Sequence, residues 1–163
     1  MTAQKAGLSY EKDVAADVEN NTPKSVRVVF GGGTSGNVRI PQPDLHITSG
    51  SLGAVRVHNI EIKRSTQDRF YIEAEDIEQL RETGNEYTTL FFMMKFTRRE
   101  PLVWRIEPHD DAADMVSKLP ECFDPHVTKS GSLRLSKPST SDWPSATAGR
   151  KDWDALCRDT GIL

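Results

Sequence analysis

Three charged residues interrupt two segments that otherwise read as apolar β-strands. Asp44 follows Pro43 in "PQPDLHITSG", and Glu61 and Lys63 flank an isoleucine in "NIEIKRS". Because side chains alternate along a strand, Glu61 and Lys63 share one face of theirs. A hairpin turn in "SGSLG", centred near Gly50 to Ser51, would pair the two strands and bring Asp44 to the same end of the sheet as Glu61. Asp44 would lie opposite the late fifties, within a bulge or splay of position 61.

This arrangement favours a divalent metal ion. Two carboxylates at one place repel each other unless a cation lies between them. Their oxygens, with the backbone carbonyl of Ile62, are the hard ligands that Mg²⁺ or Mn²⁺ prefers. Lys63 could orient a metal-bound water or stabilise the charge that develops on a phosphate. Glu11, expected on the exposed side of an N-terminal helix, would complete the metal shell directly or through a water. The chemistry indicated is phosphodiester hydrolysis.

Several of these residues also have plainer interpretations. A lone Pro-Asp or Glu-x-Lys occurs often by chance, and only their combination on successive strands favours a site. His46 and His58 are interpreted as strand residues, because no second ligand lies at metal-binding spacing. The Gly-rich "GGGTSG" is either a mobile loop that closes on a substrate or only a long connection. Trp104 is interpreted as a core residue.

The order of the expected elements predicts an α/β fold. A helix in "GLSYEKDVAADVEN", with Ser9 as its N-cap, precedes strands in "KSVRVVF", "DLHIT" and "AVRVHNIEIKR". A second helix follows in "IEAEDIEQLRETGNE", with Ile72, Ile77 and Leu80 on its apolar side. The apolar run "YTTLFFMMKF" predicts a central strand, and "PLVWRIEP" completes the sheet. We therefore expect a central mixed five-stranded sheet flanked by helices.

The pattern weakens near Pro108, which predicts a core over residues 6–107 and a C-terminal extension over residues 108–163. "DAADMVSKL" and "RKDWDALCRDTGIL" are expected to be helices. The stretch between them is rich in Ser, Thr, Pro and Gly and shows no sustained periodicity. It is expected to wrap the core or to stay partly irregular.

Composition and charge limit the class of protein. The 163 residues carry a net charge of −3, which argues against a generally basic nucleic-acid binder. The stretch from Thr22 to Pro43 nevertheless has no acidic residue, which predicts one positive face. Cys122 and Cys157 show no CxxC spacing, and no secretory or membrane-spanning segment is evident, so we expect a cytoplasmic protein with no membrane partner.

The order of Glu11, "GGGTSG", Pro43-Asp44, "EIKRS" and an acidic amphipathic helix resembles the archaeal Holliday junction resolvases. That family belongs to the PD-(D/E)XK nucleases, and the likeness covers residues 6–107. It implies a restriction-endonuclease-like nuclease core in which Asp44, Glu61 and Glu11 bind the metal. Lys63 would be the catalytic lysine. The serine of the family's loop is matched best by Ser35, or by adjacent Thr34.

The resemblance also implies a substrate and an assembly. A homodimer would cut opposed strands of a four-way DNA junction in recombination and repair, in an archaeon or an archaeal virus and in association with its nucleoid. The apolar "LFFMM" and the preceding helix would be buried either at the dimer contact or in the core. The residues expected to contact DNA are Lys24, Arg27, Thr34, Arg39, Arg64 and Arg69. A nuclease of duplex ends or flaps, or a non-catalytic DNA-binding module, remains the alternative.

Overall fold

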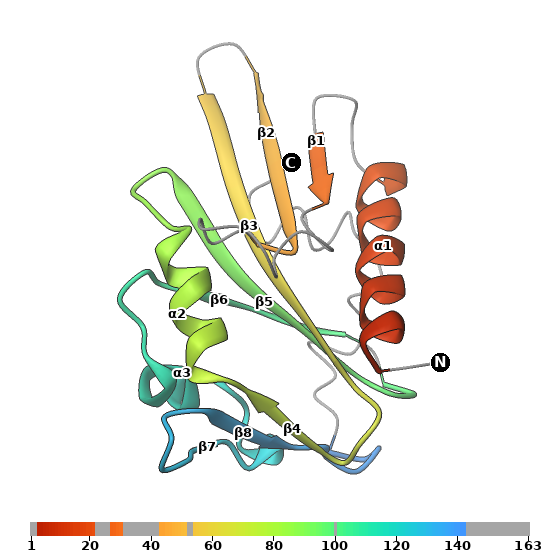
Figure 1. Cartoon of the computed structure of the whole chain (residues 1–163), viewed down its shortest axis with the longest axis vertical. Coiled ribbons are helices and arrows are strands. Elements are labelled where there is room, and N and C mark those ends of the chain that lie inside the picture. Colours follow the sequence, from red (N-terminus) through yellow and green to blue (C-terminus); the bar gives the residue numbers. More distant parts are fainter. Residues whose placement is uncertain (1–2, 22–26, 31–42, 52–53, 100, 143–163) are drawn as a thin grey trace.

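The fold is built on two β-sheets. The computed structural model describes residues 3–21, 27–30, 43–51, 54–99 and 101–142 (Figure 1). Its elements are α1 (Ala3–Asn21), β1 (Arg27–Phe30), β2 (Leu45–Ser51), β3 (Ala54–Ser65), β4 (Arg69–Ile72), α2 (Ala74–Glu82), β5 (Thr88–Phe96), β6 (Leu102–Ile106), α3 (Ala112–Lys118), the 3₁₀ turn η1 (Glu121–Phe123), β7 (His126–Val127) and β8 (Leu133–Ser136).

The larger sheet has five strands in the order β1-β2-β3-β5-β6. β3 and β5 run parallel, and the other neighbours are antiparallel, so the expected mixed five-stranded sheet is confirmed. The parallel pair needs a crossover connection, and β4 with α2 supplies it. β5 lies between β3 and β6, as an interior strand should.

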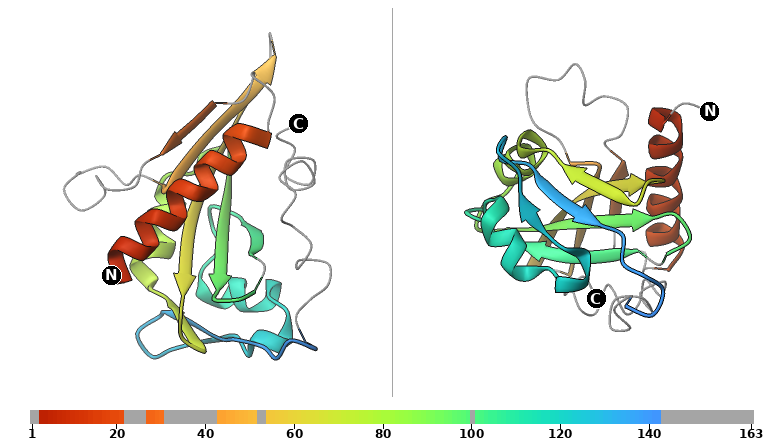
Figure 2. Two further views of the ribbon diagram at one scale, coloured as in Figure 1. Left: turned by 90° about the vertical axis from the view of Figure 1, so that its right-hand side faces the viewer. Right: turned by 90° about the horizontal axis from the view of Figure 1, so that it is seen from below.

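The two faces of this sheet are covered by different layers. α1 lies across one face (Figure 2, left), with Val14 and Val18 packed against apolar residues of β2, β3, β5 and β6. α2 and the smaller sheet cover the other face, where their apolar residues pack against Leu90 and Phe92 of β5. β5 is apolar almost throughout because alternate residues enter the two cores: Phe91 faces α1 and Phe92 faces α2.

The smaller sheet has the order β4-β8-β7. Phe70 and Ile72 of β4 and Leu133 and Leu135 of β8 are buried, so one face of this sheet packs on the core. These residues share their apolar cluster with Phe92 of the larger sheet. The part of the extension that the structure describes therefore packs directly against the layer formed by the preceding elements.

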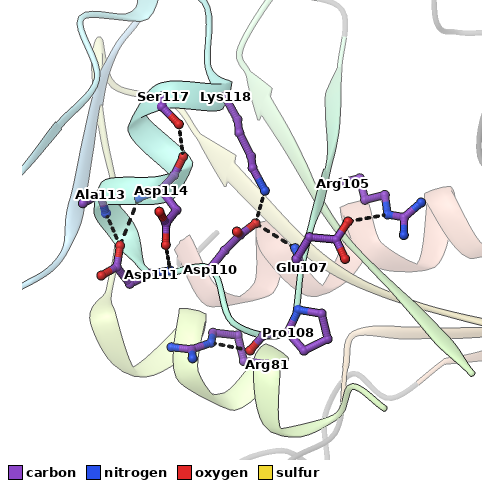
Figure 3. Close-up of polar contacts among 10 residues, drawn as sticks. All are labelled: Arg81, Arg105, Glu107, Pro108, Asp110, Asp111, Ala113, Asp114, Ser117 and Lys118. Atoms are coloured by element: carbon purple, nitrogen blue, oxygen red, sulfur yellow. Dashed lines mark hydrogen bonds and ion pairs between the residues drawn. The ribbon is translucent and has the colours of Figure 1, made fainter. Parts of the chain in front are cut away.

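The turn between β6 and α3 is held by polar contacts (Figure 3). The buried Asp110 carboxylate accepts a hydrogen bond from the Glu107 N–H at 2.7 Å and pairs with the Lys118 ammonium. Asp111 and Asp114 form a reciprocal capping box at the start of α3. Together these contacts fix the direction in which the chain leaves the larger sheet.

Some local predictions were wrong. α1 begins at Ala3, so Ser9 lies inside the helix and is not its N-cap, because the preceding Ala, Gln and Lys are good helix formers. Ile72 ends β4 and precedes α2. The stretch expected either to wrap the core or to stay partly irregular packs on the core in its described part, and it contains β7 and β8, two short strands that were not predicted. The expected C-terminal helix lies outside the described residues.

No helix within the described part of the chain combines the length and the apolar character needed to cross a membrane.

Candidate active site

Asp44 lies beside Glu61 at the junction of β2 and β3. Leu45 pairs with Ile60 across these antiparallel strands, so the residue before Leu45 and the residue after Ile60 face each other. The Ile62 N–H donates to Asp44 Oδ2 at 2.7 Å, which anchors that carboxylate to β3. The N–H and carbonyl of a strand residue point to the same side, so the Ile62 carbonyl faces the same corner.

The register differs from the one expected. Ser51 pairs with Ala54, so the turn is centred after Ser51 and not between Gly50 and Ser51. Gly50 continues β2 as the partner of Val55, although glycine is usually a turn signal. The shift places Asp44 opposite Glu61 without the bulge that the expected register required.

Lys63 joins this pair from the same face of β3. Its Nζ lies 2.7 Å from Glu61 Oε1 and 3.1 Å from Asp76 Oδ1. Asp76 is in the first turn of α2, where the helix dipole favours a negative charge. Asp76 is not among the site residues expected from the sequence. Its only available signal was its position in the first turn of the acidic helix that follows the Glu-x-Lys strand.

Glu11 approaches the site from α1. β1 ends at Phe30, which pairs with Leu45, so Asp44 lies just past the end of the edge strand. Glu11 precedes the buried Val14 and Val18 by one and two helical turns and therefore lies on the same side of α1. The expectation that Glu11 is on the exposed side of its helix was wrong, because this side packs against the sheet.

The site holds more negative charge than its own cation balances. Burial, and then the charge of Asp44, raises the pKa of Glu61 to about 8. The same two causes, in the same order, raise the pKa of Glu11 to about 7. Burial also raises the pKa of Asp44, and the hydrogen bond from Ile62 opposes this only in part. A further cation among these carboxylates would relieve the repulsion.

Lys63 is held in its charged form. Burial alone would lower the pKa of its ammonium, but the neighbouring carboxylates of Glu61 and Asp76 outweigh burial and raise it. Lys63 is therefore a fixed positive charge at this site and is poorly suited to accept a proton.

The donor set fits a hard divalent ion. Asp44, Glu61 and the Ile62 carbonyl offer only oxygen, and a carboxylate pair with raised pKa values gains from a positive ion. In the described residues, no three His, Cys, Asp or Glu side chains already form a metal-holding group. The fit therefore rests on two carboxylates and one carbonyl, with water filling the remaining positions, as is usual for Mg²⁺.

His46 and Asn59 lie on the same face of the sheet, where their hydrogen bonds give them a structural role. Asn59 Nδ2 donates to the Thr83 carbonyl at 3.1 Å, which leaves its Oδ1 to accept from His46 Nδ1 at 2.6 Å. These bonds join β2, β3 and the end of α2 beside the charged residues. His46 is thus a bonded strand residue, in agreement with its interpretation from the sequence.

The structure describes only some of the residues expected to contact DNA. Arg69 is exposed on β4, and Arg64 is exposed on β3 with its Cζ 5.8 Å from the centre of the Tyr10 ring. Lys95 of β5 places its Nζ 5.1 Å from the same ring. Arg27 lies on β1, and its side chain is not described. The others lie outside the described residues: Lys24, Thr34, Ser35 and Arg39.

Comparisons with known proteins agree with this architecture. The fold is similar to that of a Holliday junction resolvase from the archaeal hyperthermophile Archaeoglobus fulgidus, with a TM-score of 0.53 and 15% sequence identity. That match covers 86% of this chain and 88% of the other. No curated protein matches the sequence. The family model described as archaeal Holliday junction resolvase (Hjc) matches residues 2–118. This chain therefore belongs to the archaeal Holliday junction resolvase family.

Proposed function

We propose that this protein resolves four-way DNA junctions by divalent-metal-dependent hydrolysis, cutting opposed strands as a homodimer. The observation that carries the proposal is the site itself, in a member of this family. Asp44 and Glu61 face each other across β2 and β3, with the Lys63 ammonium 2.7 Å from Glu61. Two carboxylates and a fixed cation on adjacent strands are the parts that phosphodiester hydrolysis needs.

The metal would be held by Asp44, Glu61 and the Ile62 carbonyl. The Ile62 N–H donates to Asp44 Oδ2 and would hold this carboxylate in place for a metal. Glu11, half-buried on the α1 side of the site, would complete the shell through a water. Mg²⁺ or Mn²⁺, when bound, lowers the pKa of its water and polarises a phosphoryl oxygen.

Lys63 would bind the phosphate under attack. Its raised pKa keeps it charged, so it donates hydrogen bonds and stabilises the negative charge that develops on the phosphoryl oxygens. Asp76 would hold the Lys63 side chain in position from α2. Ser35, or adjacent Thr34, would add a hydroxyl contact to the same phosphate.

DNA binding would use the phosphate backbone rather than base sequence. Arg64 and Arg69 are exposed on β3 and β4, and Lys24, Arg27 and Arg39 come from the acid-free stretch before Asp44. A two-fold enzyme suits a two-fold junction, because two identical sites can then meet two equivalent strands. Residues 6–107 would form the nuclease core, with residues 108–163 as a C-terminal extension.

The deciding experiment compares a labelled four-way junction with a linear duplex of the same sequence, in Mg²⁺ and in EDTA. We expect symmetric cuts in the junction that require Mg²⁺ and are absent from the duplex. Asp44→Asn, which keeps the shape of the side chain, should remove them. Equal cleavage of both substrates would support a general nuclease instead, and binding without cleavage in any divalent metal would support a non-catalytic DNA-binding module.

A further inference from the structure

The outer face of the smaller sheet carries an aromatic and basic row. Because Phe70 and Leu135 point into the core, their strand neighbours point away from it. Arg134 pairs with Tyr71 on one side and with His126 on the other, and directly paired residues share a face. Arg69, two residues before Tyr71, lies on the same face. We call these four residues, Arg69, Tyr71, His126 and Arg134, the outer row. The view from below looks onto this sheet (Figure 2, right).

Arg69 and Tyr71 of the outer row are exposed, and His126 and Arg134 are half-buried. The charge of Arg134 is only loosely paired. Tyr71 is 47% exposed, which is unusual among the large apolar side chains that the structure describes. Arg134 Nη2 lies 3.4 Å from Asp124 Oδ2, and the Asp124 side chain is 72% exposed. The Arg134 side chain is 25% exposed, so this long contact to an exposed acid contributes little, and the arginine can exchange this partner for another anion.

The surrounding sequence is another stretch of the chain without acidic residues, like the one from Thr22 to Pro43. Residues 125–141 contain no Asp or Glu, although the whole protein has a net charge of −3. The same stretch carries Lys129, Arg134 and Lys137 together with seven Ser and Thr residues. Lysine, arginine and small hydroxyl side chains are the groups that hydrogen-bond to DNA phosphates. Lys137 Nζ lies 3.6 Å from Asp68 Oδ1, and the composition of this stretch favours a polyanion as its partner.

β4 ties the outer row to the candidate active site. The chain passes from Lys63 on β3 through β4 to Asp76 on α2, and the 3.1 Å contact between these two side chains closes that loop. Lys63 and Tyr71 therefore belong to one short stretch of chain that the Lys63–Asp76 contact closes. β7 and β8, by contrast, lie beyond the residues that the family model matches, 2–118.

We propose that the outer row binds the phosphate backbone of a double-stranded DNA arm next to the strand being cut. This inference rests on the proposed function for its choice of substrate. The surface adds affinity for the DNA and takes no part in the hydrolysis. Each arginine that neutralises a phosphate releases counterions, so the surface has a measurable effect on the salt dependence of binding.

The test measures the affinity of the full chain for a fluorescent four-way junction, in EDTA, at several salt concentrations. Arg69→Gln with Arg134→Gln removes two charges and leaves the buried residues unchanged. We expect the slope of log Kd against log salt to fall by about 2, at about 0.9 per phosphate contact, and affinity to fall about tenfold at low salt. Arg105→Gln, an exposed arginine on β6 paired with Glu107, is the matched control.

Asp124→Asn should raise the affinity for DNA, the opposite of the effect expected for the double variant. Asp124 has φ 45°, a left-handed conformation that asparagine tolerates well, so the fold should be kept. Freeing Arg134 from this acid should tighten binding about two- to threefold. Wild-type slopes in the double variant, or weaker binding by Asp124→Asn, would overturn the proposal. If the wild-type chain does not cleave the junction, only the proposed function is refuted. The salt dependence of DNA binding is measured without cleavage and can be repeated on linear duplex.

Discussion

Lys63 Nζ lies 3.1 Å from Asp76 Oδ1, so a lysine on β3 is held by a carboxylate from the first turn of α2. The same ammonium lies 2.7 Å from Glu61 Oε1. Lys63 therefore bridges the sheet and the helix that covers it. Because Asp76 stays on α2, it can hold Lys63 in place when a metal draws Glu61 toward itself.

Asp76→Asn should slow cleavage without weakening DNA binding. The substitution removes the charge but keeps the size of the side chain, so Lys63 loses a charge-assisted bond and is held less firmly. We expect the single-turnover rate at saturating junction to fall about tenfold, with the Kd for DNA within about twofold of wild type. Glu75→Gln, an exposed acid beside Asp76 on α2, is the control. Equal rates for the two variants would refute a positioning role for Asp76.

Asp44→Asn should weaken metal binding. Its remaining side-chain oxygen can still accept the Ile62 N–H, so the strand junction is kept while the charged ligand is lost. We expect the Kd for Mn²⁺ to rise at least about tenfold, and cleavage to fall by about 100-fold or more. Titration calorimetry with Mn²⁺ measures the first effect without DNA. Glu78→Gln on the exposed side of α2 should bind Mn²⁺ like wild type, and similar binding by Asp44→Asn would exclude Asp44 as a ligand.

The sequence was sufficient to predict the larger sheet, because its strands carry clear patterns. β5 is apolar on both faces and β3 alternates, and each pattern follows from the layers that cover the strand. Asp44 and Glu61 could be placed together for the same reason. The exact register could not, because Gly50 looked like a turn residue and instead continues β2.

Other parts of the site depend on tertiary packing that no local pattern contains. Asp76 belongs to the site because α2 crosses the sheet beside Lys63, and the acidic helix sequence does not encode that crossing. The position of Glu11 could have been read from its helical spacing to Val14 and Val18. β8 was not predicted because only Leu133 and Leu135 mark its buried face, and two apolar residues are too few to show an alternating pattern.

Glu61 should make the metal-free protein less stable at alkaline pH. Its pKa in the folded chain, about 8, is above the ordinary value of 4.5, so its contribution is fully present below about pH 4.5. That contribution is lost as the pH rises through about 8, because the buried carboxylate then ionises beside Asp44. Glu11, with a pKa of about 7, acts in the same direction.

We expect the free energy of unfolding in EDTA to fall by on the order of 2 kcal/mol between pH 5.5 and pH 9. Urea unfolding at several pH values measures this change. Glu61→Gln, which cannot ionise, should flatten the profile, and Mg²⁺ should restore stability mainly at the alkaline end because it binds the ionised carboxylates. A wild-type profile that rises toward pH 9 in EDTA would contradict the arrangement of these acids.

Asp110 should contribute more to stability than Lys118, its partner in the turn before α3. Burial on its own would raise the pKa of Asp110, but the Glu107 N–H and the Lys118 ammonium outweigh it and lower the pKa. Asp110→Ala leaves the Glu107 N–H and the Lys118 ammonium without this acceptor, whereas Lys118→Met leaves the Glu107 bond in place. We expect losses of about 2–3 kcal/mol and about 1 kcal/mol in the free energy of unfolding, respectively.

The lowered pKa of Asp110 also predicts how its contribution to the free energy of unfolding changes with pH. The stability that this group contributes is present above its ordinary pKa of 3.8 and is lost as the pH falls through its lower folded value. The difference in unfolding free energy between wild type and Asp110→Ala, measured in urea, should therefore shrink at strongly acidic pH. Asp142→Ala, which removes an exposed acid, should show little loss at any pH. A constant difference for Asp110→Ala down to the lowest pH would indicate that packing, and not the carboxylate charge, supports the turn.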